Sequence, residues 1–221
     1  MALTKLGFFG EVKWDLLIYL ARIYKNLGFK VGLLDASLEK KLEYFLPKDL
    51  TMEIIDYDEM THFLSYFEGC DVTDFDFLLI NIGFNTDGIQ RLLMTDQQYL
   101  ITSYNRKTIE ASQKLLIEIS ESSKDFTYHQ IFIDYISSDI KKKYINYVLS
   151  KDHDLIIRNT YYLDVHEKIL KGRLSLQHKA VKKTIKLPKD YYQLYQDVIL
   201  DTCQSNKRKI KKAYKKSRKG C

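Results

Sequence analysis

The chain has 221 residues, of which 45% are hydrophobic and 29% are charged, the composition of an ordinary globular domain that can bury a sizeable core. No apolar run approaches the roughly 18–20 residues that a membrane-spanning helix needs, and the N-terminus lacks the basic and apolar regions of a secretory signal. Three cysteines, Cys70, Cys203 and Cys221, show no metal-ligand spacing, which argues against a disulfide or zinc framework. We therefore predict a cytoplasmic protein.

The net charge of +6 is the average of two unlike regions. Residues 206–219 contain nine of the 35 basic residues and no acidic residue, so the rest of the chain carries 26 basic against 29 acidic residues. The body is therefore mildly acidic, with a net charge of −3. We predict one domain at residues 1–205 and a basic C-terminal tail at residues 206–221.

Along the chain, short apolar runs alternate with longer segments of helical period. The strands are predicted at residues 3–9, 30–35, 52–55, 77–82, 98–103, 129–136 and 154–157. The helices are predicted at residues 14–27, 38–44, 59–67, 88–94, 106–119, 140–149 and 165–170, with a last helix after Pro188. Alternation of strand and helix is typical of an α/β domain with a mostly parallel sheet that helices cover on both faces.

The loop after the first strand is the first place to look for a ligand site, because ligands of doubly wound folds lie beyond the carboxyl ends of the strands. Here residues 7–14 read GFFGEVKW. A phosphate-binding loop reads GxxxxGK followed by Ser or Thr: its glycines let backbone N–H groups face a phosphate, its lysine neutralises charge, and its hydroxyl holds Mg²⁺. Gly7 and Lys13 have this spacing, whereas Val12 and Trp14 replace the second glycine and the hydroxyl residue. An ordinary strand-to-helix turn with a solvated lysine is the alternative.

Several segments resemble those of one known family, in the order in which that family has them. Residues 7–13 correspond to its phosphate loop, residues 19–28 (YLARIYKNLG) to the end of its first helix, and residues 30–35 (KVGLLD) to a strand that ends in aspartate. Residues 75–83 (FDFLLINIG) and 95–103 (TDQQYLITS) resemble its next two strands. On these segments the chain resembles the ParA/MinD-like family of P-loop ATPases, also called the deviant Walker A, SIMIBI-class family.

The resemblance implies a P-loop NTPase fold with ATP and Mg²⁺ as cofactors, and a homodimer that encloses the nucleotide. It places the phosphate-loop region at Gly7, Gly10, Lys13 and Asp35. The departures from the family pattern fall on catalytic positions, and they are Phe8 for the signature lysine, Val12, Trp14, and Ser37 and Asn81 for aspartates. Phosphoryl transfer depends on positioning and charge neutralisation, so these losses together predict that hydrolysis is lost. We also expect the rings of Trp14, Phe8 and Phe9 to fill the phosphate site, so that no cofactor is bound.

The predicted function is therefore that of a pseudo-ATPase, a non-catalytic adaptor or positioning protein that binds protein partners, a homodimer mate included. Its predicted setting is a bacterial cell pole, a membrane, a secretion or pilus machinery, or partitioning. One alternative is an active or slow ATPase in which Lys13 still binds ATP with Mg²⁺. Another is a nucleic-acid-binding module that uses the basic tail.

The tail itself has three interpretations. Ile210, Ala213 and Tyr214 share one face of a helix, which would suit contact with an anionic membrane, as made by the C-terminal helix of MinD-like proteins. This contact would place the protein peripherally at the inner face of the membrane. The second interpretation is contact with nucleic acid phosphates, and the third is a disordered, solubilising tail. The basic residues available to an anionic partner are Lys207, Arg208, Lys209, Lys211, Lys212, Lys215, Lys216, Arg218 and Lys219.

Overall fold

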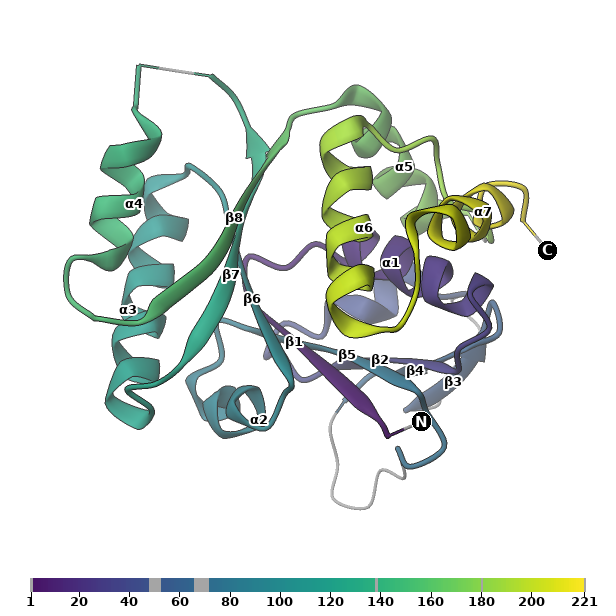
Figure 1. The fold of residues 1–221 in the computed structure, drawn as a ribbon, viewed down its shortest axis with the longest axis horizontal. Coiled ribbons are helices and arrows are strands. Elements are labelled where there is room, and N and C mark those ends of the chain that lie inside the picture. The colour runs from purple at the N-terminus through teal and green to yellow at the C-terminus, as the bar shows by residue number, and fades with distance from the viewer. Residues whose placement is uncertain (1, 48–52, 66–71, 138, 180, 221) are drawn as a thin grey trace.

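The computed structural model describes residues 2–47, 53–65, 72–137, 139–179 and 181–220, and in these residues one eight-stranded sheet has helices on both faces (Figure 1). The strands are β1 (Thr4–Gly10), β2 (Val31–Asp35), β3 (Ile54–Tyr57), β4 (Met60–Phe63), β5 (Phe77–Gly83), β6 (Gln97–Thr102), β7 (Thr127–Tyr135) and β8 (Ile156–Asp164). Their order across the sheet is β3-β4-β2-β5-β1-β6-β7-β8, and the paired strands are parallel except for β3 and β4. The predicted fold class is confirmed.

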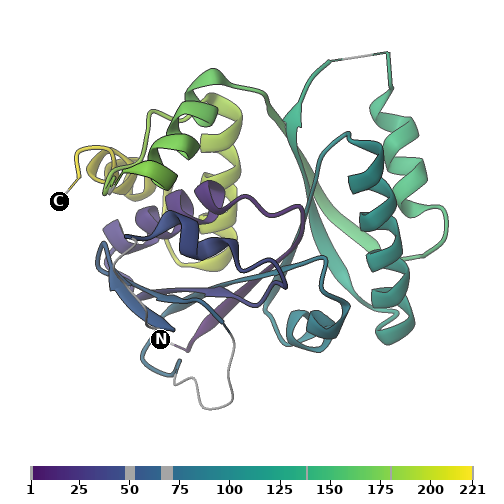
Figure 2. The ribbon, with the colours of Figure 1, turned by 180° about the vertical axis from the view of Figure 1, so that it is seen from behind.

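The helices form two groups on opposite sides of the strands (Figure 1, Figure 2). One group comprises α2 (Ile89–Leu93), α3 (Arg106–Ser122) and α4 (Lys142–Ser150), and the other comprises α1 (Trp14–Asn26), α5 (Glu167–His178), α6 (Lys189–Thr202) and α7 (Lys207–Ser217). Short 3-10 helices at Lys41–Phe45 and Thr86–Gly88 follow β2 and β5. Successive side chains of a strand point to opposite faces, so Phe8 of β1 belongs to the core under α1 and Phe9 to the core under α3.

The central strands β2 and β5 are buried along their whole length. Parallel strands that helices cover on both faces need apolar side chains at nearly every position, and these strands read VGLLD and FLLINIG. Such continuous runs explain why the sequence located the central strands correctly. The carboxyl ends of these strands also position the site described below.

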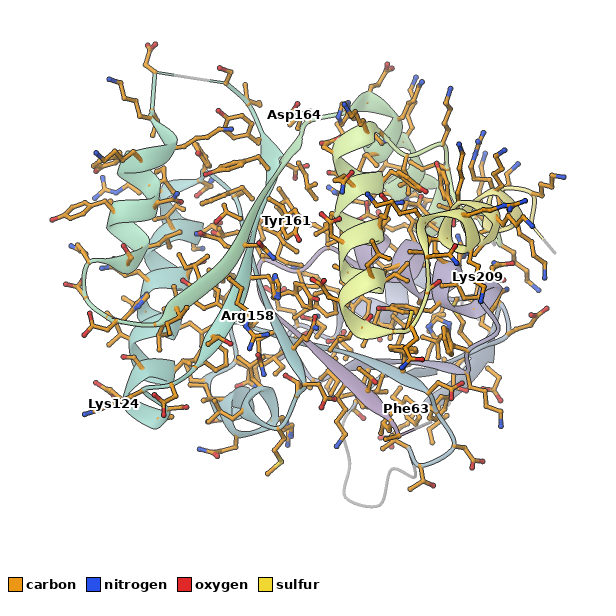
Figure 3. All side chains as sticks on the ribbon, in the orientation of Figure 1. Phe63, Lys124, Arg158, Tyr161, Asp164 and Lys209 are labelled. Carbon is orange, nitrogen blue, oxygen red and sulfur yellow. The ribbon has the colours of Figure 1, made fainter. Side chains whose placement is uncertain are left out.

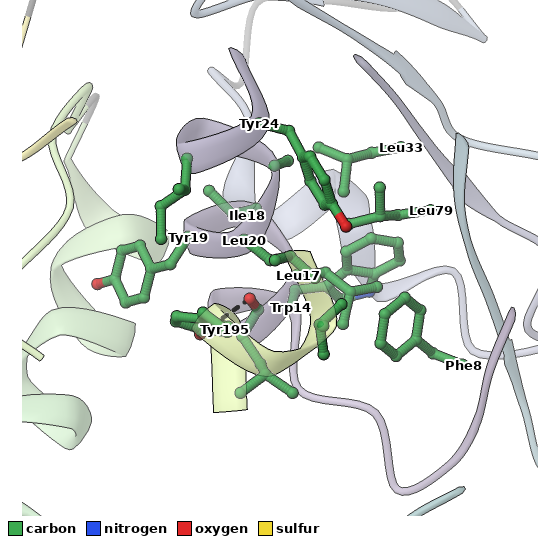
Figure 4. Packing of buried hydrophobic residues seen from close by; sticks show 14 of the residues in the cluster. Phe8, Trp14, Leu17, Ile18, Tyr19, Leu20, Tyr24, Leu33, Leu79 and Tyr195 are labelled. Atoms are coloured by element: carbon green, nitrogen blue, oxygen red, sulfur yellow. Dashed lines mark hydrogen bonds between the residues drawn. The ribbon is translucent and has the colours of Figure 1, made fainter. Parts of the chain in front are cut away.

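Helix α1 is buried over most of its length, with every residue from Trp14 to Tyr24 buried. It has the sheet on one side and α5, α6 and α7 around it, so apolar residues occur on more than one face (Figure 4). The Tyr195 hydroxyl of α6 donates a hydrogen bond of 3.0 Å to the carbonyl of Leu16 and joins these two helices. The start of α1 is therefore held firmly from the core side.

The helix predicted at residues 59–67 is wrong where the structure describes it, because residues 60–63 form β4 and pair with β3 in an antiparallel hairpin. The hairpin turns at Asp58 and Glu59, whose φ values of 55° and 56° are left-handed. Arg22 and Lys25 of α1 bind the Asp58 carboxylate and hold this turn, which is a long-range contact that local periodicity cannot reveal. Residues 66 and 67 of that prediction lie outside the described residues, as does residue 52 of the predicted strand 52–55.

Three other predicted elements have different boundaries in the structure. The strand predicted at 154–157 is the nine-residue β8, whose burial is mixed because it lies at the edge of the sheet. Helix α5 covers residues 167–178 rather than 165–170. In place of the helix predicted at 38–44, the structure has the 3-10 helix Lys41–Phe45.

The basic C-terminal segment is a helix that packs on α1. Asn206 caps α7 by accepting a hydrogen bond of 3.0 Å from the backbone N–H of Lys209. Ile210, Ala213 and Tyr214 are buried in the core that contains α1, and the Tyr214 hydroxyl accepts a bond of 2.7 Å from the Leu187 N–H. The expectation of a disordered tail is therefore wrong, and so is the expectation that this apolar stripe is free to lie on a membrane.

Two further predictions concern membrane-spanning helices and the cysteines. No helix in the described part of the chain is both long and apolar enough to cross a membrane. Cys203 is a free, half-buried thiol, whereas Cys70 and Cys221 lie outside the described residues.

Candidate functional site

A cleft of about 740 Å³ opens at the carboxyl ends of β1, β2 and β5. The connections that follow these three strands line it, together with side chains from α3 and α5. Parallel strands of this topology all end at one edge of the sheet, which is where ligands of such folds bind. The cleft is therefore the candidate site.

The connection between β1 and α1 is very short. β1 continues to Gly10, and α1 begins at Trp14, so only residues 11–13 lie between them. The N–H of Glu11 donates to the carbonyl of Ile101 at 2.7 Å, and the N–H of Val12 donates to the carbonyl of Gly10 at 2.9 Å. These two backbone donors are thus engaged within the protein.

The two glycines of the loop pattern have different surroundings. Gly10 has a φ of +89°, and a Cβ there would lie 2.3 Å from the carbonyl oxygen of Ile101, so only glycine fits this turn. Gly7 lies within β1 and does not line the cleft. A Cβ at Gly7 would lie 2.7 Å from side-chain atoms of Leu92 and of Thr95, so this glycine allows α2 and its C-terminal turn to approach the strand closely.

Lys13 lines the cleft and is paired with a carboxylate of its own loop. Its Nζ lies 2.7 Å from Oε1 of Glu11. The other oxygen of Glu11, Oε2, accepts hydrogen bonds from Ser103 at 2.6 Å and Thr108 at 3.2 Å. Burial alone would raise the pKa of Glu11, but the hydrogen bonds from Lys13 and Ser103 outweigh it and lower the pKa below its ordinary value. Glu11 is therefore ionised at neutral pH.

Asp35 at the end of β2 has a buried carboxylate with four donors around it. Oδ1 accepts from the Ser37 N–H at 3.1 Å, the Ser37 hydroxyl at 2.6 Å and the Asn81 amide at 3.2 Å, and Oδ2 accepts from the Leu42 N–H at 3.0 Å. Burial raises the pKa of Asp35, and these bonds only partly offset that effect. The carboxylate thus organises the connection after β2 and ties it to β5.

The aromatic rings do not fill the cleft as expected. Phe8 and Phe9 are buried on opposite faces of the sheet, where Phe8 stacks on Tyr99 at a centroid distance of 5.1 Å. Only Trp14 lines the cleft, and its ring packs into the core beside Phe8 and Tyr195 (Figure 4). The expectation is wrong for Phe8 and Phe9 because strand alternation places both rings in the core, and the cleft stays open.

One residue of the cleft, Arg173, lies in a segment that no sequence pattern had linked to the site. Arg173 of α5 lines the cleft, and its Nε lies 2.9 Å from Oδ1 of the buried Asp15 in the first turn of α1. Burial raises the pKa of Asp15, although the charge and hydrogen bond of Arg173 act against it. Asp15 and Arg173 are 158 residues apart, and no local pattern signals that they meet.

The rim of the cleft carries large apolar side chains that are open to solvent. Leu38 is 75% exposed and Tyr44 is 60% exposed, and both follow β2. Phe84 adds a third apolar side chain directly after β5. This side of the molecule therefore presents apolar surface beside charged groups.

Away from the cleft, α7 presents a strongly basic face. The seven basic residues of α7 are exposed, and so are Arg218 and Lys219 directly after it, which completes the nine predicted basic residues; Lys209 is labelled in Figure 3. The N–H of Thr184 donates to the carbonyl of Ser217 at 2.8 Å, which brings the exposed Lys182 and Lys183 beside the end of α7. In the described part of the chain, none of the nine forms a salt bridge with a carboxylate.

One group of side chains in the described residues has the chemistry of metal ligands: Asp164, His166 and Asp190, whose ligand atoms lie within 4.8 Å of one another. Asp190 is already bonded in this cluster, because Oδ1 lies 3.2 Å from His166 Nε2 and Oδ2 accepts from the Asp164 N–H at 2.8 Å. These contacts explain the cluster as a link between the end of β8, where Asp164 is labelled in Figure 3, and the start of α6.

The strand order and the cleft at the carboxyl ends define an α/β fold of the P-loop NTPase type, the fold of the ParA and MinD ATPases. No protein-family model matches the chain, and no curated protein matches its sequence. Solved structures do match.

A putative plasmid partition protein from Borrelia burgdorferi, bound to AMPPNP, superposes with a TM-score of 0.59 at 14% identity over 90% of this chain and 98% of its own. A ParA family ATPase from Chlorobium tepidum gives a TM-score of 0.56 at 14% identity, covering 79% of this chain and 90% of its own. The MinC:MinD cell division complex of Aquifex aeolicus gives 0.55 at 13% identity, covering 85% and 99%. At these identities the similarity establishes the fold.

Proposed function

We propose that this protein is a ParA/MinD-like pseudo-ATPase that acts as a non-catalytic adaptor or positioning protein. The observation that carries the proposal is the connection between β1 and α1. A phosphate-binding loop needs several backbone N–H groups directed at one anion. The N–H groups of Glu11 and Val12 instead donate to Ile101 and Gly10, and an ionised carboxylate is bonded to Lys13. This connection does not fit a nucleotide phosphate.

The residues present do not fit Mg²⁺ either. Mg²⁺ takes oxygen ligands in a nearly ideal octahedron and is usually bound through carboxylates and phosphates. The residue after Lys13 is Trp14, whose ring is buried in the core and offers no oxygen. Asn81 is neutral, and its amide is used to donate to Asp35 and to accept from the Gly83 N–H at 2.9 Å. Because phosphoryl transfer depends on such positioned charges, we infer that hydrolysis does not occur here.

An adaptor role is supported by the apolar rim of the cleft. Leu38, Tyr44 and Phe84 stand at the edge where strands β2 and β5 end, and exposed apolar surface of this kind suits contact with protein. The proposed partners are proteins, among them a second copy of this chain held by direct contacts. The similar structures belong to a plasmid partition protein and a cell division complex, and these processes are the settings to test first.

The experiment is a calorimetric titration with ATP and Mg²⁺, combined with a phosphate-release assay. We expect no binding and no release in the wild-type protein, and the same in Lys13→Ala. Lys107→Ala is the matched control, since Lys107 lines the same cleft outside the β1–α1 connection. Tight, Mg²⁺-dependent binding that disappears only in Lys13→Ala would establish the alternative, an active or slow ATPase that uses Lys13.

A second function is favoured by the exposed charges of α7. Its seven basic residues, with Arg218 and Lys219 after it, face solvent while its apolar side chains are buried, so its free surface offers charge and little else. This arrangement suits contact with nucleic acid phosphates better than insertion into a bilayer, which requires apolar side chains. The proposed contact is non-specific and electrostatic.

A further inference from the structure

The Glu11 carboxylate is held at the meeting point of three segments. Lys13 belongs to the β1–α1 connection, Ser103 follows β6, and Thr108 lies in the first turn of α3. All three donate to this one carboxylate, at 2.7, 2.6 and 3.2 Å. A side chain that only faced solvent would not collect three donors from three different segments.

We propose that Glu11 is a built-in anion, which occupies an anion site formed by Lys13, Ser103 and Thr108. The inference rests on the proposed function and deepens it, because a site satisfied by its own chain needs no phosphate-bearing ligand. The protein then holds one state permanently and does not switch with nucleotide. The ligand class that Glu11 replaces is a small oxyanion such as phosphate or pyrophosphate.

The charges around the carboxylate support this assignment. Lys13 is the residue that precedes α1, and Thr108 is the third residue of α3, so both lie near the positive ends of helix dipoles. The depressed pKa of Glu11 shows that its surroundings favour the negative form over the neutral one. A site that stabilises one carboxylate in this way is chemically suited to other oxyanions.

The tether between Glu11 and its site makes displacement difficult. An intramolecular group linked by a short chain acts at an effective concentration of about millimolar or higher. Glu11 also neutralises Lys13, so an approaching phosphate meets a charge pair in place of a free cation. Removing Glu11 should therefore expose an anion site that the wild-type protein conceals.

The test is a calorimetric titration with inorganic pyrophosphate, using wild-type protein, Glu11→Ala and the double variant Glu11→Ala/Lys13→Ala. We expect the association constant to rise by about tenfold or more in Glu11→Ala, as charge-assisted hydrogen bonds become available, and to fall again in the double variant. Glu39→Ala is the matched control, because Glu39 lines the same cleft and pairs with Lys41 instead. This control should bind pyrophosphate as weakly as wild type.

A folded Glu11→Ala protein with wild-type affinity for pyrophosphate overturns the inference. Where that variant does not fold, Glu11→Gln keeps the size of the side chain and removes its charge, and an unchanged affinity in folded Glu11→Gln overturns the inference equally. Tight binding of ATP with Mg²⁺ by the wild-type protein would instead overturn the proposed function. The two failures are therefore distinguished by which protein and which ligand give the signal.

Discussion

His62 of β4 is buried and faces the interior with little compensation for a charge. Burial lowers its pKa from 6.5 to about 4, although a contact of 3.2 Å between Nε2 and the Tyr57 carbonyl acts in the opposite direction. In the unfolded chain the imidazole is protonated near pH 6.5, whereas in the folded protein it is protonated only near pH 4. The folded state therefore keeps its full stability with respect to His62 above pH 6.5, and this stability is lost progressively as the pH falls toward 4.

We expect protonation of His62 to be the main cause of a measurable loss of stability at acidic pH. Between pH 7.5 and pH 5.0, the wild-type free energy of unfolding should fall by about 2 kcal/mol more than that of His62→Gln. Urea denaturation at the two pH values measures the difference. His178→Gln is the control, because His178 is exposed and should leave the profile unchanged. Parallel profiles for wild type and His62→Gln would refute the assignment.

Within the site, individual residues show which features the sequence motif predicted and which it missed. The loop pattern marked Gly7 and Lys13, and the family resemblance added Gly10; Gly10 and Lys13 lie at the cleft, whereas Gly7 lies within β1 and does not line it. The pattern gave no sign that Glu11 accepts bonds from Ser103 and Thr108, because those donors lie about ninety residues further along the chain. The partner of a charged side chain is set by tertiary contacts that spacing alone does not encode.

At the level of elements, α1 is the hub that joins the sheet to the C-terminal part of the chain. The guanidinium of Arg22 is buried, with Nε 2.6 Å from Oδ2 of Asp58 in the β3–β4 turn and Nη1 2.8 Å from the carbonyl of Lys183. It also donates to the carbonyl of Val181. One side chain thus connects α1 to the hairpin and to the segment that leads to α6.

Replacing this arginine should be costly. Arg22→Ala leaves the buried carboxylate of Asp58 with Lys25 as its remaining cation, at 3.0 Å, and leaves two carbonyls without their donor. Breaking a buried ion pair in this way costs about 3–5 kcal/mol, and Lys25 should hold the loss toward the lower end. Urea denaturation at pH 7.5 gives the measurement.

The control for Arg22 is Arg106→Ala, which removes an exposed pair with Glu110 on α3. Surface ion pairs of this kind contribute little to the free energy of unfolding, so the midpoint of urea denaturation should not change. Equal, small effects of both substitutions would mean that the Arg22–Asp58 contact does not hold the hairpin. A large effect of Arg22→Ala alone is the expected result.

For the molecule as a whole, the segregation of charge is the most distinctive property. An acidic body with a net charge of −3 carries a basic face on α7 and the two residues after it, where nine cations lie within residues 207–219. Duplex DNA should bind this face with an affinity that falls steeply with salt, because each neutralised phosphate releases a counterion. Reversing Lys211 and Lys215 to Glu should weaken binding by about tenfold or more in 50 mM salt.

Fluorescence anisotropy with a labelled duplex, at 50 and 200 mM salt, measures this effect. The matched control reverses Lys141 and Lys143, which are exposed on the other side of the molecule at the start of α4 (Figure 1). Equal losses in both double variants would show that net charge, and not the α7 face, governs the affinity. Binding to phosphatidylserine vesicles without binding to DNA would favour the membrane contact.

The sequence by itself determined the α/β class, the central strands and the position of the candidate loop. It could do so because these features rest on local patterns: continuous apolar runs for buried parallel strands, a 3.6-residue period for α1, and the spacing of Gly7 and Lys13 where β1 leads into α1. Only the tertiary structure decided the β3–β4 hairpin, the docking of α7 on α1, and the Glu11 and Arg173 contacts at the cleft. Each of these depends on groups that are far apart along the chain, so their energies appear only when the fold brings them together.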